Sequence, residues 1–285
     1  VQKLCAPILL LCGGIDPTAE AGLTADMQHA ARLGVRAYSI VTALTCQDAV
    51  AFTRLTAVAD TDLIEAVRAL RRQSPPQVAK IGLIASLHQL RLLVREIRAL
   101  FPACRIVWDP ILRTSSGTDL LPDASRESLL EVAELVDVIL PNHYESRHLF
   151  GESIPHEWVE HTHTAVISKS ASSTEEDVTD RAYLPDGRLI ESTTPRLGED
   201  RHGTGCLYAT TLCAALARGE DDQEALHAAQ RATMHYRLGR GQGAPVRRLP
   251  LGRRMFVTHA TTTAETLQQI DLVLRQSLAD IVELR

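Results

Sequence analysis

Residues 201–206 read Arg-His-Gly-Thr-Gly-Cys, and the apolar segment Leu207–Leu216 follows them directly. This segment predicts a buried helix, because Arg218 supplies a basic last turn and Gly219 a stop signal. Glycines at a helix start let backbone N–H groups turn toward an anion, and the helix dipole adds positive potential there. Cys206 falls in the first turn, where we expect a stabilised thiolate that acts as a nucleophile or base. The alternative is a glycine-rich loop that only turns the chain into a buried helix.

Length, composition and charge are those of an ordinary globular protein. The 285 residues suffice for one large α/β domain or two small ones, and 45% of them are hydrophobic. The formal charge of −5 argues against a nucleic-acid binder, and we interpret Arg247–Arg248 and Arg253–Arg254 as solvated surface. The six cysteines form no C-x-x-C pair, so we expect free thiols in the cytoplasm.

The apolar run Ile8–Cys12 leads directly into Gly13–Gly14. It is far shorter than the ~20 residues that a membrane span needs, and it is too short for a convincing signal peptide. We interpret it as a buried first strand and expect no membrane segment.

Strand-like and helix-like segments alternate along most of the chain. The expected strands are Ala6–Cys12, Val35–Leu44, Val78–Ile84, Arg105–Trp108, Val136–Leu140 and Thr164–Ser168. The expected helices are Leu23–Leu33, Asp60–Gln73, capped by Asp60 or Thr61, Ser86–Leu100, Ser125–Leu135, His143–Phe150 and Gln223–Leu238. This alternation predicts a doubly wound, mostly parallel α/β sheet with helices on both faces. Pro185–Gly187, between Asp177–Leu184 and Arg188–Thr193, predicts a late antiparallel edge hairpin.

The C-terminal part of the chain has a different character. Residues Leu251–Thr263 are rich in Thr and Arg, so we assign residues 1–250 to the α/β domain and 251–285 to an extension. Within Ala264–Arg285 an apolar stripe predicts an amphipathic helix that docks on the core or on a partner chain. The stripe consists of Leu267, Ile270, Leu274, Leu278 and Ile281.

Polar residues cluster at the expected carboxyl ends of the strands, where open α/β sheets bind ligands. They are Asp16, Gln47, Asp109, Asn142, Glu145 and Lys169. Each one alone is commonly a turn or cap residue. Together, opposite a glycine-rich helix start, they predict a binding site.

The chemistry of this set suits phosphoryl transfer, which requires positioning and charge neutralisation. The helix N-terminus and Lys169 would bind phosphate oxygens. Asp109 and Glu145 would hold Mg²⁺ directly or through water, and Cys206 would face the accepting hydroxyl. No G-x-x-x-x-G-K-[ST] segment is present, which excludes a P-loop enzyme.

Histidines offer a weaker signal. A polar connection carries His156, His161 and His163, but no cysteine accompanies them and their spacing does not favour a metal site. His202, next to the glycine-rich turn, would donate to a phosphate or cap the turn.

The order of these motifs resembles the hydroxymethylpyrimidine/phosphomethylpyrimidine kinases of thiamine biosynthesis, in the ribokinase superfamily. The resemblance runs from about Ile8 to Leu249, and His202–Cys206 is its most specific part, because most of the superfamily has Asp where these kinases have Cys. The other matching segments are Thr42–Asp48, Lys80–Leu83, Asp109–Ile111, Pro141–Glu145 and Gly239–Pro245.

The resemblance implies an ATP- and Mg²⁺-dependent kinase, often a homodimer, that acts on 4-amino-5-hydroxymethyl-2-methylpyrimidine and its monophosphate. It implies a pyrimidine pocket lined by Gly14, Asp16, Ala21, Gln47, Leu83 and Ile111. It implies that Asn142, Glu145, Lys169 and Thr204 serve the nucleotide, that Gly203, Thr204 and Gly205 form the anion hole, and that Cys206 is catalytic.

The chain departs from the family pattern in three places. Ala19 and Glu20 replace paired glycines of the first loop, Ser170–Ser172 replaces Gly-Gly-His after Lys169, and Ile111–Arg113 replaces a small apolar segment. Two alternatives therefore stay open. One is a related kinase of pyridoxal or another hydroxymethyl heterocycle, against which Cys206 weighs. The other is a ligand-binding relative without turnover.

Overall fold

The computed structural model describes residues 6–47, 52–114, 117–198 and 201–238, and the backbone of 247–248, 254–257 and 281–283. The chain divides into two compact units, Val1–Met234 and His235–Arg285. The second unit contains a small sheet of β10 (Arg247–Arg248), β11 (Arg254–Val257) and β12 (Ile281–Glu283). Most of the predicted C-terminal amphipathic helix lies outside the described residues, and Ile281, the last member of its stripe, lies in strand β12 instead.

The first unit is built on a nine-stranded sheet with the order β3-β2-β1-β4-β5-β6-β7-β8-β9. The strands from β2 to β7 in this order are parallel, and antiparallel strands lie at both edges: β3 on one side, β8 and β9 on the other. Their bounds are β1 Ile8–Ile15, β2 Arg36–Gln47, β3 Phe52–Ala57, β4 Val78–Ile81, β5 Arg105–Trp108, β6 Val138–Ile139, β7 Ala165–Ser173, β8 Asp177–Tyr183 and β9 Leu189–Pro195. The predicted sheet and its late hairpin are confirmed.

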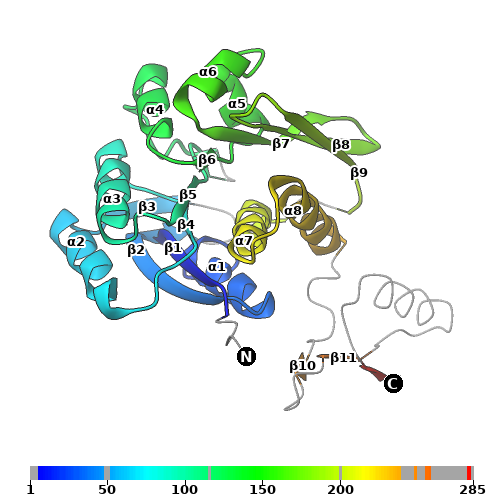
Figure 1. Ribbon diagram of the computed structural model, residues 1–285, viewed down its shortest axis with the longest axis horizontal. Coiled ribbons are helices and arrows are strands. Elements are labelled where there is room, and N and C mark those ends of the chain that lie inside the picture. The colour runs from blue at the N-terminus through cyan, green and yellow to red at the C-terminus, as the bar shows by residue number, and fades with distance from the viewer. Residues whose placement is uncertain are drawn as a thin grey trace. The chain divides into compact units, whose positions relative to one another are not determined.

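Helices cover both faces of this sheet (Figure 1). The cluster on one face contains side chains of α2, α3, α4, α5 and α6, and the other contains those of α1, α7 and α8. The helix bounds are α1 Gly22–Arg32, α2 Asp60–Ala69, α3 Leu87–Leu100, α4 Arg126–Ala133, α5 His143–Phe150, α6 His156–Thr162, α7 Thr204–Ala217 and α8 Asp222–Arg237, with a 3-10 turn at Leu70–Arg72. No helix of the described residues is long and apolar enough to cross a bilayer.

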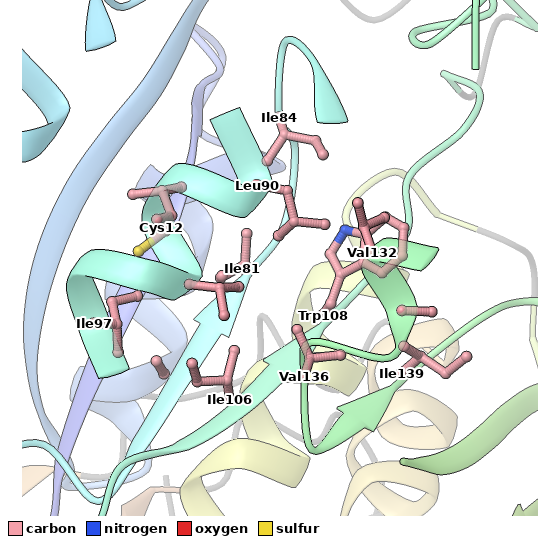
Figure 2. Packing of buried hydrophobic residues seen from close by; sticks show 14 of the residues in the cluster. Cys12, Ile81, Ile84, Leu90, Ile97, Ile106, Trp108, Val132, Val136 and Ile139 are labelled. Carbon is pink, nitrogen blue, oxygen red and sulfur yellow. The ribbon is translucent and has the colours of Figure 1, made fainter. Parts of the chain in front are cut away.

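Continuous apolar runs in the central strands serve both faces, since successive side chains of a strand point to opposite sides. In β1, Leu9 and Leu11 join the cluster with α1 and α7, whereas Leu10 and Cys12 join the cluster with α3. Figure 2 shows the second of these clusters, with Trp108 among the side chains between the sheet and its helices.

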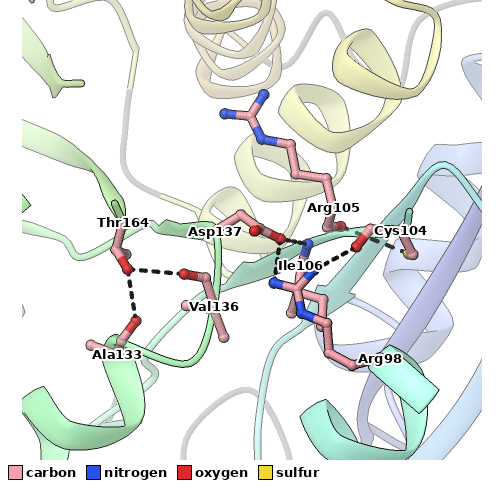
Figure 3. A network of polar contacts seen from close by, with 8 residues as sticks. All are labelled: Arg98, Cys104, Arg105, Ile106, Ala133, Val136, Asp137 and Thr164. Carbon is pink, nitrogen blue, oxygen red and sulfur yellow. Dashed lines mark hydrogen bonds and ion pairs between the residues drawn. The ribbon is translucent and has the colours of Figure 1, made fainter. Parts of the chain in front are cut away.

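Polar contacts fix the amino ends of the parallel strands (Figure 3). Asp137, which precedes β6, accepts the backbone N–H of Ile106 at 2.6 Å and pairs with Arg98 at 2.8 Å. Thr164, which precedes β7, donates to the carbonyl of Val136 at 3.0 Å. These bonds set where β5, β6 and β7 begin, and they leave the opposite edge of the sheet for ligands.

Three local predictions were wrong or incomplete. Strand β3 was not predicted, and helix α6 occupies what was interpreted as a polar connection. Helix α2 has Ala59 at its N-cap with no side-chain cap bond, although Asp60 or Thr61 was expected there. The acidic first turn of α2, Asp60 and Asp62, still suits the positive helix end.

Candidate active site

The loop that follows β1 is held by the carboxylate of Asp16. Its Oδ1 accepts a hydrogen bond from the backbone N–H of Thr18 at 2.9 Å, and its Oδ2 accepts one from Ala21 at 3.0 Å. The side chain of Gln47, at the end of β2, also hydrogen-bonds to Asp16. Burial alone would raise the pKa of Asp16, but these hydrogen bonds together lower it. Two predicted pocket residues, Asp16 and Gln47, therefore lie in contact.

Other predicted pocket residues lie at the ends of neighbouring strands. Gly14 packs so closely on Leu83 that a Cβ at Gly14 would be 2.6 Å from Leu83 Cδ2. Ile111 reaches within 3.9 Å of the position that a Cβ would take at Gly82. Leu83 and Ile111 are half-buried, and Ala21 is buried. These residues surround the junction of β1 and β4, where the strand order reverses direction and open sheets bind ligands.

The start of α7 is pressed against the first loop. Gly203 is the N-cap with φ +82°, and a Cβ there would collide with the carbonyl oxygen of Glu20. Among the residues that the structure describes, none lies within 4 Å of the position that a Cβ would take at Gly205. His202 Nε2 lies 3.4 Å from Asp16 Oδ2. The turn thus needs glycine at 203 for space and conformation, and it is open beside Gly205 at the positive end of the helix.

Cys206 lies in the first turn of α7, buried, and accepts a hydrogen bond from the backbone N–H of Gly22. The pKa of its thiol is raised to about 11, chiefly by burial and also by the carboxylate of Asp26, whereas Lys80 acts in the opposite direction. The prediction of a stabilised thiolate was therefore wrong. The desolvation of this side chain outweighs the helix dipole, so Cys206 is a neutral thiol at pH 7.

Lys169, within β7, lies close to Asp109, which follows β5, and to Glu145, in the first turn of α5 after β6. Lys169 Nζ lies 2.5 Å from Asp109 Oδ1, and Glu145 is buried nearby. The pKa of Glu145 is raised to about 7, chiefly by burial; Lys169 lowers it and Asp109 raises it. The predicted phosphate-binding lysine and the two predicted metal ligands therefore lie together in a nearly closed environment.

Asn142 and Glu145 hold the start of α5 through a reciprocal capping box. Asn142 Oδ1 accepts the backbone N–H of Glu145 at 2.9 Å, and Glu145 Oε2 accepts that of Asn142 at 2.8 Å. Lys169 donates its backbone N–H to the carbonyl of Pro141 at 2.8 Å. The Asn-x-x-Glu spacing thus has a structural use, and it fixes both side chains beside Lys169.

Three residues of the site neighbourhood were missed as candidates. Lys80 Nζ lies 2.5 Å from Asp26 Oδ1, with both side chains almost fully buried, and Thr210 Oγ1 donates to the same oxygen at 2.8 Å. The sequence signal for this pair is a lysine inside the apolar strand Val78–Ile81, because lysine is almost never fully buried without a partner of opposite charge.

Two of the family departures keep backbone conformations that glycine favours. Ala19 has φ +59° and Ser170 has φ +50°, in the left-handed region. The N–H of Ser170 donates to the buried carboxylate of Asp180 at 2.7 Å. The strand β7 continues past Lys169 to Ser173, with a register shift between Ser168 and Ser172. Both positions thus hold a left-handed conformation with a side chain in place.

The three histidines of the expected polar connection lie in α6, as His156 and His161, and at its C-cap, as His163. His156 packs its ring on Tyr183, with centroids 5.3 Å apart. Across the described ranges, no three His, Cys, Asp or Glu side chains group as a metal site by themselves.

Comparison with known proteins identifies a family. The model of the phosphomethylpyrimidine kinase family matches residues 16–243. A thiamine biosynthesis multifunctional protein of Corynebacterium glutamicum is 30% identical over 281 residues, 92% of this chain and 36% of its own length. A hydroxymethylpyrimidine/phosphomethylpyrimidine kinase of Staphylococcus aureus is 25% identical over 253 residues, 83% of this chain and 91% of its own. The chain thus spans about a third of the multifunctional relative.

Solved structures share the fold at lower identity. The pyridoxal kinase of Staphylococcus aureus in complex with AMP-PCP has a TM-score of 0.71 at 20% identity, covering 82% of this chain and 89% of its own. A phosphomethylpyrimidine kinase of Clostridium difficile has a TM-score of 0.65 at 20% identity, covering 81% and 99%. These likenesses agree with the mostly parallel sheet and its two layers of helices.

Proposed function

Because this chain belongs to the phosphomethylpyrimidine kinase family, we propose that it transfers the γ-phosphoryl group of ATP to 4-amino-5-hydroxymethyl-2-methylpyrimidine and to its monophosphate. The observation that carries the proposal is the position of Cys206. Its sulfur lies at the positive start of α7, against Gly22, where the first loop meets the glycine-rich turn. In the resemblance described above, cysteine rather than aspartate at this position marks the pyrimidine kinases.

The proposed roles follow from the geometry. Asp16 and Gln47 would orient the pyrimidine, between Gly14, Leu83 and Ile111. The N–H groups from Gly203 to Gly205, together with Lys169, would neutralise the phosphoryl oxygens. As a neutral thiol, Cys206 would position the hydroxyl group rather than carry charge. This suits phosphoryl transfer, in which the protein mainly positions and neutralises.

Mg²⁺ is proposed at the two carboxylates beside Lys169. Asp109 and Glu145 are buried and close enough for Asp109 to raise the pKa of Glu145, an arrangement that a divalent cation would relieve. Mg²⁺ keeps several waters and needs only one or two carboxylates plus substrate phosphates, so the donor set fits. The ion would supply further neutralisation of the phosphate charges, and Asn142 would hold Glu145 in place.

We also propose a cytoplasmic homodimer that binds neither nucleic acid nor membrane. The described cysteines, including the exposed Cys46, are free thiols, as is usual in reducing compartments. Light scattering of the purified chain will report the oligomeric state.

The test is ATP-dependent phosphorylation with Mg²⁺, with the pyrimidine and pyridoxal assayed in parallel and products identified by mass. We expect mono- and diphosphates of the pyrimidine. Phosphorylation of pyridoxal alone would favour the pyridoxal kinase alternative, which the structural neighbours include. Binding without any product from either compound would favour a relative without turnover.

A further inference from the structure

A buried ion pair connects the sheet to α1 and contacts Thr210 of α7. The side chain of Lys80, from β4, is 1% exposed and that of Asp26, from α1, is 3% exposed, and their charged atoms are 2.5 Å apart. Desolvating two charges is costly, so a buried pair is weak evidence for stability, and an apolar pair of similar volume is often as stable. None of the roles proposed above uses these two side chains.

The pair belongs to a ladder between α1 and α7. Asp26 lies four residues after Gly22, and Thr210 lies four residues after Cys206, so each pair shares one face of its helix. The Gly22 amide donates to the Cys206 sulfur, and one turn further along both helices the Thr210 hydroxyl donates to Asp26. We call the bond from Gly22 to Cys206 the lower rung and the bond from Thr210 to Asp26 the upper rung.

Lys80 anchors this ladder to the sheet. Burial alone would lower its pKa, but the carboxylates of Asp26 and Asp109 raise it, so Lys80 is a cation. Asp109 in turn pairs with Lys169. Asp26, Lys80, Asp109 and Lys169 therefore form a series of charges of alternating sign. This series connects the contact between α1 and α7 with the lysine proposed to bind phosphate.

We propose that Asp26, Lys80 and Thr210 are positioning residues that fix the register of α1 against α7 and thereby hold the Cys206 sulfur at the Gly22 amide. This proposal rests on the proposed kinase function, because Cys206 matters for turnover only if phosphoryl transfer takes place there. The alternative is that these three residues only stabilise the fold and have no effect on the position of Cys206.

The first test is Thr210→Val, which removes the upper rung without changing charge or volume. Thr211→Val is its matched control, because Thr211 is also buried on α7 and its hydroxyl has no hydrogen-bond partner among the described residues. We expect Thr210→Val to lower kcat about tenfold, since small misplacements at a transfer site have large effects. The KM values for ATP and pyrimidine should change less than about twofold, because substrate binding is not displaced. The control should match the wild type.

The second test removes both charges together, as Lys80→Met with Asp26→Leu. The double variant should fold with a melting temperature near that of the wild type, because no unpaired charge is left. Amide hydrogen exchange at Gly22, followed by mass spectrometry, reports the lower rung without any need for turnover. We expect faster exchange at Gly22 and a lower kcat in both Thr210→Val and the double variant.

Unchanged exchange, or unchanged kcat in variants that exchange faster, would overturn the positioning role. A wild-type chain without kinase activity would instead refute the proposed function. The exchange measurement would then still decide whether the upper rung holds Cys206 against Gly22.

Discussion

The two ends of the parallel strands carry ion pairs of opposite character. At the amino ends, Arg98 and Asp137 are 35% and 36% exposed, and backbone groups of Cys104 and Ile106 share their hydrogen bonds. At the carboxyl ends, Lys169 and Asp109 are 12% and 3% exposed. Half-exposed pairs form at little desolvation cost, whereas buried pairs must be compensated. The chain thus keeps its costly charges at the edge where the phosphate-binding chemistry is proposed.

One of the two largest effects expected at the carboxyl edge is that of Gly203→Ala. A methyl group there would collide with the Glu20 carbonyl, and the residue would also have to keep φ +82°. We expect kinase activity to fall more than about a hundredfold, since the anion-binding turn must move. Gly219→Ala is the matched control: Gly219 has φ +85°, but no atom of the described part of the chain lies within 4 Å of an added Cβ. It should lose about 1–2 kcal/mol of stability and keep its kcat. Equal activity in the two variants would contradict the account.

Replacing one cation at the carboxyl ends and one at the amino ends of the parallel strands tests whether the two ends differ in function. Lys169→Met should abolish turnover, because it removes the phosphate-binding charge and leaves the buried Asp109 without its partner. Arg98→Met should only reduce the free energy of unfolding by about 1 kcal/mol, since its pair is half-exposed. Urea unfolding and kcat of both variants are the measurements. If Arg98→Met impaired turnover as severely as Lys169→Met, the two ends would not differ in function.

Acid should weaken the fold through His29, another buried titratable group, on α1. Burial, Arg32 and Lys80 lower its pKa from 6.5 to about 4. Between pH 6.5 and 4, His29 is protonated in the unfolded chain but stays neutral in the folded one. The free energy of unfolding that His29 contributes is therefore complete above pH 6.5 and is lost as the pH falls toward 4. We expect His29 to account for roughly 2–3 kcal/mol of acid destabilisation. His29→Leu should flatten the dependence of unfolding free energy on pH, whereas the exposed His161→Gln should not. An unchanged slope in His29→Leu would show that His29 does not contribute.

The smallest effects are expected at the two departures from the family pattern. Ser170→Gly and Ala19→Gly would relieve a left-handed conformation that disfavours a Cβ by about 1–2 kcal/mol. Glycine also gains entropy in the unfolded chain, so the net stabilisation should stay below about 1 kcal/mol. Thermal unfolding will measure it. A loss of stability in either variant would show that its side chain is a stabilising contact.

Much of the fold could be predicted because its central strands are buried on both faces. The run Ile8–Cys12 followed by two glycines is unambiguous, and Asn142 and Glu145 mark the start of α5. Strand β3 was missed because it is an antiparallel edge strand whose side chains are mostly exposed. Helix α6 was missed because it is seven residues long and has no side-chain cap.

Only the site residues that follow apolar strands could be predicted from the sequence. Asp109 and Lys169 were recognised because each follows an apolar strand. Lys80 and Asp26 were not, since their partnership depends on how α1 packs over the sheet. The thiolate of Cys206 was wrongly expected for the same reason: a helix start is visible in sequence, whereas burial of its first turn is not.

The most direct test of the account is the turnover of Cys206→Ala together with its affinity for ATP, measured by calorimetry. We predict loss of phosphorylation with nucleotide binding nearly unchanged, because Lys169 and the start of α7 stay in place. Turnover near that of the wild type would contradict it, since Cys206 would then not belong to the phosphoryl-transfer centre.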